Sequence, residues 1–74
     1  MTMKKIYKLE NLDCAVCAEK MKRAIEKIEG VESCEVSFLM QKLTICADES
    51  KMDEIIKKAE KACKKVEPDC IIHY

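Results

Sequence analysis

Two segments of this 74-residue chain place apolar side chains at helical spacing, and short segments of alternating polarity lie around them. The spacing predicts amphipathic helices over residues 15–29 and from about residue 52 to about residue 65. Gly30 supplies a stop for the first helix, and Asp48 or Ser50 supplies a cap before the second. The alternating segments predict strands over residues 4–10, 31–39, 43–46 and 70–74. Because each helix has one apolar stripe and each strand one apolar face, both helices are expected to cover one side of a sheet.

The order strand, helix, strand, strand, helix, strand predicts a single α+β domain over residues 1–74. We expect a ferredoxin-like βαββαβ sandwich, with four antiparallel strands and both helices on one face. Hydrophobic residues make up 49% of the chain, which suffices for one small core. Basic and acidic residues number 14 each, which argues against nucleic-acid binding, because such a surface needs a basic excess. No apolar run approaches the roughly 20 residues that cross a membrane.

The six cysteines raise the alternative of a secreted domain held by disulfides. This alternative is disfavoured, because no apolar signal core follows the first residues and the chain has one glycine and one proline. Cys34, Cys63 and Cys70 fall on inward faces of predicted elements, where cysteine packs as a small hydrophobe. Cys46 falls on an outward face. We therefore expect free thiols and a cytoplasmic location.

Cys14 and Cys17 lie where the first strand pattern ends and the first helical pattern begins. A helix N-terminus leaves backbone N–H groups unpaired and carries partial positive charge, so it favours a thiolate. Two thiolates can bind a soft or borderline metal ion, or they can exchange with a disulfide. Cys17 is expected to begin the buried stripe of the helix. Asp13 precedes the pair, and the residues alone leave open whether it is a metal ligand or a helix cap.

The order of the elements favours metal binding over redox catalysis. Thioredoxin-like proteins also place two cysteines at a strand-to-helix turn, but their chains usually end in a helix. Here a strand is predicted last, and the one proline, Pro68, comes just before it. A small dithiol redox protein remains the alternative from another functional class.

The charge of the site favours a divalent ion. If Asp13 is a ligand together with the two thiolates, their charges sum to about −3, which leaves about −1 around a divalent ion and about −2 around Cu(I). Three ligands fall short of the four in a closed structural zinc site, so the pattern predicts a site for transfer or sensing. Glu10, Glu19 and Asp69 could supply a fourth ligand, although each is expected to be a solvated charge. His73 is expected at the surface.

The residues now support a resemblance to a known family. Leu-Asp-Cys-Ala-Val-Cys-Ala at residues 12–18 and Ile-Glu-Gly-Val at residues 28–31 resemble the heavy-metal-associated domain, over essentially the whole chain. Copper-handling members usually carry Met-Thr before the first cysteine, whereas this chain has Leu12 and Asp13. That pair, and residues 66–69, look like the amino-terminal domains of P-type ATPases that transport zinc, cadmium and lead.

The resemblance implies that Asp13, Cys14 and Cys17 bind Zn(II), Cd(II) or Pb(II), with Cu(I) disfavoured. It further implies that the domain delivers the ion to, or regulates, a heavy-metal-exporting P-type ATPase of which it is the N-terminal domain. Its partners would be the transmembrane and other cytoplasmic domains of that pump. The chain itself would be a monomer that catalyses nothing and does not cross the membrane. A free-standing copper or zinc metallochaperone is the closest alternative.

Overall fold

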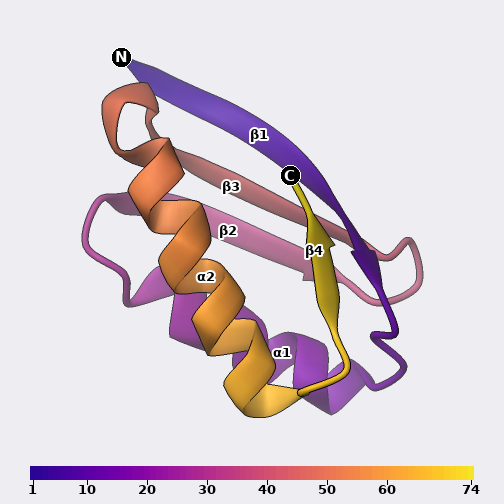
Figure 1. Ribbon diagram of the computed structural model, residues 1–74. Coiled ribbons are helices and arrows are strands. Elements are labelled where there is room, and N and C mark those ends of the chain that lie inside the picture. The colour runs from indigo at the N-terminus through magenta and orange to yellow at the C-terminus, as the bar shows by residue number, and fades with distance from the viewer.

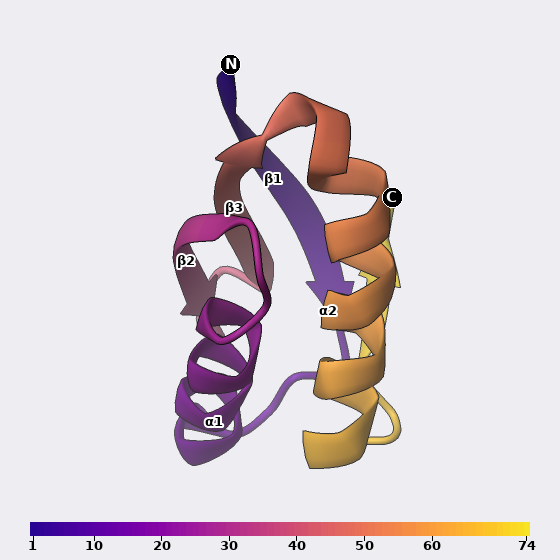
Figure 2. The ribbon, with the colours of Figure 1, turned by 90° about the vertical axis from the view of Figure 1, so that its left-hand side faces the viewer.

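Two helices cover one face of a four-stranded antiparallel sheet in the computed structural model, which describes all residues 1–74 (Figure 1). The strand order is β2-β3-β1-β4, and Figure 2 shows the helices side by side in front of the sheet. The elements in chain order are β1 (Thr2–Glu10), α1 (Ala15–Glu26), β2 (Val31–Ser37), β3 (Lys42–Asp48), the 3-10 turn η1 (Glu49–Lys51), α2 (Met52–Val66) and β4 (Ile71–His73). The predicted ferredoxin-like fold is confirmed.

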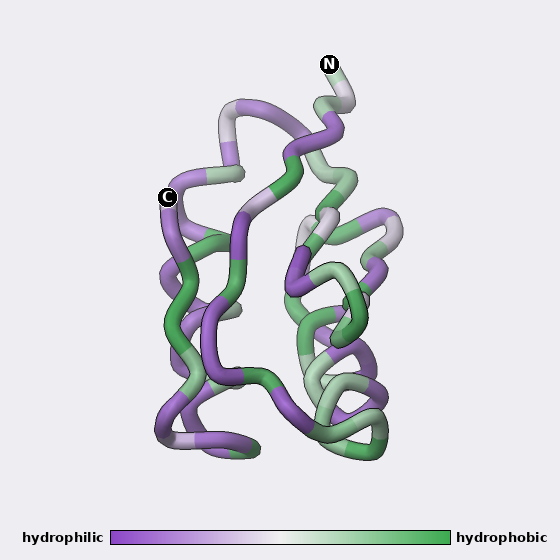
Figure 3. Tube along the Cα trace, turned by 90° about the vertical axis from the view of Figure 1, so that its right-hand side faces the viewer, coloured by the Kyte–Doolittle hydropathy of each residue, from purple (hydrophilic) through white to green (hydrophobic).

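The core lies between the sheet and the helices, and alternation along the strands decides which side chains enter it. Tyr7 and Leu9 of β1 are buried, with Leu43 of β3 opposite Tyr7 and Ile72 of β4 opposite Leu9. Figure 3 shows apolar and polar residues alternating along β1. No helix covers the other face of the sheet (Figure 2), and Ile6 on that face of β1 is 60% exposed. The helices therefore pack on the face that carries most of the apolar side chains of the strands.

α1 ends at Glu26, so the predicted end at residue 29 is wrong. The Ile28 N–H donates to the carbonyl of Ile25, a bond between residues three apart that closes a turn instead of another α-helical step. Gly30 follows with a φ of +99°, the left-handed region that glycine adopts at little cost. The glycine does stop the helix, but the chain has left helical geometry before reaching it.

The strand boundaries also differ from the prediction. β2 ends at Ser37 because residues 38–41 form a turn, in which the Ser37 Oγ accepts the N–H of Met40 at 3.2 Å. β1 and β3 are longer than predicted, since their pairing continues to Thr2 opposite Asp48. β4 is shorter, because only its residues 71–73 pair with β1.

Of the two predicted caps before α2, Asp48 is the one that accepts hydrogen bonds. Its Oδ1 accepts the N–H of Ser50 at 2.9 Å and the Ser50 hydroxyl at 2.7 Å. This cap starts the 3-10 turn η1, and α2 continues from it without a side-chain cap of its own.

Candidate metal centre

The two thiols lie where the sequence places them, at the start of α1. Cys14 is the N-cap residue, with extended backbone angles, and its Sγ accepts the N–H of Cys17 at 3.4 Å. The Cys14 carbonyl accepts the N–H of Ala18 at 3.0 Å, the first helical bond. The cap position is thus taken by sulfur, and the reading of Asp13 as the cap is wrong.

The two thiols differ in acidity because hydrogen bonds shift their pKa values in opposite directions. Hydrogen bonds from the N–H and then from the thiol of Cys17 lower the pKa of Cys14. The pKa of Cys17 is raised, first because its thiol donates to Cys14, then by burial and by the negative charges of Cys14 and Glu67. Lys20 lowers both pKa values. Cys14 is therefore the first of the pair to become a thiolate, as expected for a thiol at a helix N-terminus.

Cys17 is only half-buried, so it borders the core instead of beginning its fully buried stripe. Ala18, Met21 and Ile25 form that stripe, at 4%, 0% and 0% exposure. Cys17 is thus partly accessible, and its backbone N–H lies against the sulfur of Cys14.

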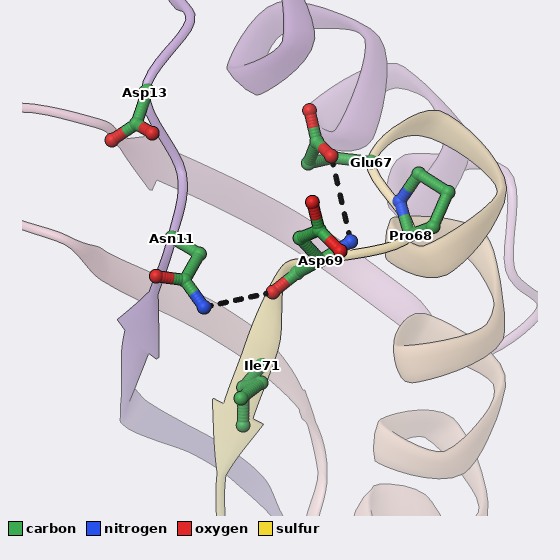
Figure 4. Close-up of a pocket in the computed structure, with 6 residues that line it drawn as sticks. All are labelled: Asn11, Asp13, Glu67, Pro68, Asp69 and Ile71. Atoms are coloured by element: carbon green, nitrogen blue, oxygen red, sulfur yellow. Dashed lines mark hydrogen bonds between the residues drawn. The ribbon is translucent and has the colours of Figure 1, made fainter.

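Residues 11–14, between β1 and α1, form a loop that we call the thiol loop. A groove of about 570 Å³ lies between this loop and the turn that joins α2 to β4 (Figure 4). Its charged lining residues are all acidic: Asp13, Glu67 and Asp69. Asn11, Pro68 and Ile71 complete the lining. Asp13 is exposed and makes no hydrogen bond or ion pair. The groove thus brings three carboxylates from two distant parts of the chain to one side of the thiol loop.

The structure brings Cys14 and Cys17 together and places Asp13 in the groove, which the thiols do not line. No group of three or more His, Cys, Asp or Glu side chains is arranged so that it could hold a metal ion. The predicted ligands Asp13, Cys14 and Cys17 are therefore close in sequence, but the structure does not gather all three side chains around one point.

Two of the three residues considered for a fourth ligand are engaged in ion pairs, and the third, Asp69, is an exposed residue that lines the groove. Glu10 pairs with His73, whose Nε2 lies 3.2 Å from the Glu10 carboxylate, and Glu19 pairs with Arg23 at 3.4 Å. Asp69 lines the groove, and its N–H donates to the Glu67 carboxylate at 3.4 Å. His73 is exposed, as predicted.

Glu67 is the one charged residue of the groove that the sequence did not single out as a candidate ligand. It lines the groove, and its charge acts on Cys17 although it follows Cys17 by 50 positions. In the sequence, Pro68 indicates that α2 ends here and that the chain turns toward β4. It does not indicate that this turn lies beside the thiols, because that position depends on how α2 packs against α1.

The remaining cysteines are core or strand residues, as predicted. Cys34, Cys63 and Cys70 are buried, and burial raises the pKa of Cys34 and of Cys63 to about 12. Cys46 is half-buried on the outward side of β3. None of the six cysteines forms a disulfide.

A thiol pair at the first turn of a helix, beside carboxylates on a ferredoxin-like scaffold, defines a class of small domains that bind soft or borderline metal ions. Comparison with known protein families places the chain in such a class. The chain belongs to the heavy-metal-associated domain family, whose profile matches residues 6–65.

The relatives include pumps for several metals. The chain is 35% identical over 66 residues, 89% of its length, to the cadmium, zinc and cobalt-transporting ATPase of Bacillus subtilis, of which the match covers 9%. It is 43% identical over 37 residues, half of its length, to the probable copper-transporting ATPase PacS of Synechocystis, of which the match covers 5%. The chain thus spans less than a tenth of the pumps it matches.

Among solved structures, the N-terminal domain of ZntA in its apo form matches 99% of this chain and 92% of that domain. The TM-score is 0.76 and the identity 27%. The chain is thus a heavy-metal-binding domain related to the N-terminal domains of P-type ATPases. No helix in it has the length and apolar character needed to span a membrane.

Proposed function

We propose that Cys14, Cys17 and Asp13 bind one Zn(II), Cd(II) or Pb(II) ion as cargo. The observation that carries this proposal is the position of the thiol pair beside a groove whose charged lining is entirely acidic. Two thiolates and a carboxylate suit a divalent ion that accepts both sulfur and oxygen. Asp13 has no partner to lose when it rotates toward the sulfurs, so gathering the ligands costs little.

Glu67 is the best-placed fourth ligand in this proposal. It comes from the turn after α2, lines the groove with Asp13, and its charge reaches Cys17. An ion bound by the loop and by this turn would connect two parts of the chain. A ligand at the surface can also be replaced by one from a partner, which suits a site that passes its ion on.

We further propose that the domain serves a heavy-metal-exporting P-type ATPase, as its cytoplasmic N-terminal domain, and that the isolated domain is a monomer. The similarity to the zinc, cadmium and cobalt pump supports this role. The chain would deliver the ion to the pump or regulate its turnover. In a pump that carries this domain, replacing Cys14 and Cys17 with serine would lower zinc-stimulated ATP hydrolysis. An unchanged rate would contradict both roles.

The test of metal preference is a competition titration of Zn(II), Cd(II), Pb(II) and Cu(I) on wild type and on Asp13→Ala. We expect one divalent ion per chain, and a loss of preference for Zn(II) over Cu(I) in Asp13→Ala. Asp53→Ala is the matched control, because Asp53 is an exposed aspartate in the first turn of α2, outside the groove. Equal selectivity in wild type and Asp13→Ala would remove Asp13 from the site.

A copper chaperone is the second candidate, and the similarity to the copper-transporting relative favours it. It predicts tight Cu(I) binding by Cys14 and Cys17 that does not depend on Asp13. The same titration separates the two candidates, since a carboxylate contributes little to a soft monovalent ion. A measured reduction potential in the range of dithiol oxidants, together with weak binding of every metal, would instead support the redox alternative.

A further inference from the structure

The side chain of Gln41, in the turn between β2 and β3, is hydrogen-bonded to the thiol loop. Its Oε1 accepts the N–H of Leu12 at 3.1 Å, and its Nε2 donates to the carbonyls of Leu12 and Phe38. The main-chain carbonyl of Gln41 accepts the N–H of Leu9 at 2.7 Å. One amide side chain thus pairs with both backbone groups of Leu12, as a neighbouring strand would.

The backbone conformation of Gln41 does not favour glutamine, so the hydrogen bonds of its side chain are the reason for a glutamine at this position. Its φ is +52°, in the left-handed region that glycine or asparagine adopts more readily. A residue chosen only for the turn would be one of these two. Glutamine keeps an unfavourable backbone angle and gains hydrogen bonds to a loop 29 positions away in sequence.

Leu12 is the point at which this contact reaches the metal site. It directly precedes Asp13 and Cys14, and its side chain is 1% exposed. On its other side, Asn11 has a φ of +65° and donates from Nδ2 to the carbonyl of Asp69 at 3.1 Å. The loop is therefore held from the β2–β3 turn and from the turn that joins α2 to β4, just before its first candidate ligand.

We propose that Gln41 is a positioning residue for metal binding, because it fixes the backbone from which Asp13 and Cys14 project. The inference rests on the proposed function of that site. Cys17 is held by α1 itself, whereas Asp13 lies outside any regular element. Without the bonds from Gln41, the loop samples more conformations, and binding has to order it first.

The test uses Gln41→Gly, which removes the side chain and relieves the left-handed backbone, so the fold is retained. Gln41→Asn is the second variant, because it suits the same backbone and keeps an amide that is one methylene too short to reach Leu12 as glutamine does. Met40→Ala is the matched control: Met40 lies in the same turn, is 64% exposed and makes no side-chain bond to the loop.

Amide hydrogen exchange in the metal-free protein measures directly whether the hydrogen bond from Leu12 to Gln41 is present. In both Gln41 variants the Leu12 amide should lose its protection, while the Leu9 amide, bonded to the main chain of residue 41, should keep it. Met40→Ala should leave both amides as in wild type. Protection of Leu12 that survives in Gln41→Gly would overturn the proposal, whatever the metal binding shows.

Zinc affinity, measured by competition with a chelator, tests whether the loss of this hydrogen bond weakens metal binding. Both Gln41 variants should bind zinc about tenfold more weakly than wild type and Met40→Ala, as is typical when a residue that orients a ligand is removed. Asp13→Ala should cost less affinity in the Gln41→Gly background than in wild type. Unchanged zinc affinity with an unprotected Leu12 would overturn the positioning role, whereas a wild type that binds no zinc would refute the proposed function itself.

Discussion

Removing the metal should leave the fold intact, because none of the candidate ligands belongs to the core. The 17 buried residues form one cluster that contains neither Asp13 nor Cys14 nor Cys17. The loop is held by hydrogen bonds from Asn11 and Gln41 that need no ion. Zinc is therefore expected to stabilise the domain only by binding the folded state.

The size of that effect follows from binding linkage. Free zinc at about 100 times its Kd adds about 2.7 kcal/mol to the free energy of unfolding. In a domain of this size each kcal/mol raises Tm by about 4–8 °C, so the shift should be about 10–20 °C. The assay is thermal unfolding followed by circular dichroism, with zinc and with excess chelator, on wild type and on Cys14→Ser.

Two results would refute this reasoning. If chelator unfolded the wild-type domain at 25 °C, the metal would be a structural element and the core would be insufficient on its own. If zinc raised the Tm of Cys14→Ser as much as that of wild type, the ion would bind elsewhere. The serine variant retains the fold under our reading, because Cys14 is only a partly exposed cap residue and serine also caps helices.

Three further predictions concern the cysteines. Cys14 should be alkylated before Cys17 and at a pH below that typical of free cysteine, because its pKa is lowered and that of Cys17 is raised; mass mapping after brief iodoacetamide treatment checks the order. Glu67→Gln removes a negative charge that contributes to the raised pKa of Cys17, so titration of that thiol should move to lower pH, and an unmoved titration would contradict this charge effect. Cys63→Ser buries a hydroxyl among apolar side chains and should lower the free energy of unfolding in urea by about 1–3 kcal/mol, while zinc affinity stays unchanged.

The fold could be predicted from the sequence because each element has one apolar face. Tyr7 and Leu9 on one strand already define which side of the sheet is covered. The element ends could not be predicted as well, because local hydrogen bonds decide them. The bond from Ile28 to Ile25 ends α1 before Gly30, and no pattern in the apolar residues reports it.

For the candidate site, too, some features could be predicted from the sequence and others could not. The position of Cys14 and Cys17 at a helix start follows from the sequence, because the change of period occurs there. The identity of the cap does not, since Cys14 and Asp13 lie only one and two residues before Ala15, and the structure places the sulfur of Cys14 at the cap. Glu67 and Gln41 join the site only through the folded chain, from a turn 50 residues after Cys17 and a hairpin 29 residues after Leu12.

The separation between core and site bears on how such a domain could release an ion. The residues that stabilise the fold lie between sheet and helices, and the thiols lie at the edge of that layer. Exchange of a ligand therefore disturbs a loop and one helical turn, not the core. The hydrogen bonds of Gln41 and Asn11 limit how far that disturbance spreads, since they end at Leu12 and Asn11, just before Asp13. Under the proposed function, a loop that is fixed up to its first candidate ligand and exposed beyond it can present an ion to a partner while the scaffold stays unchanged.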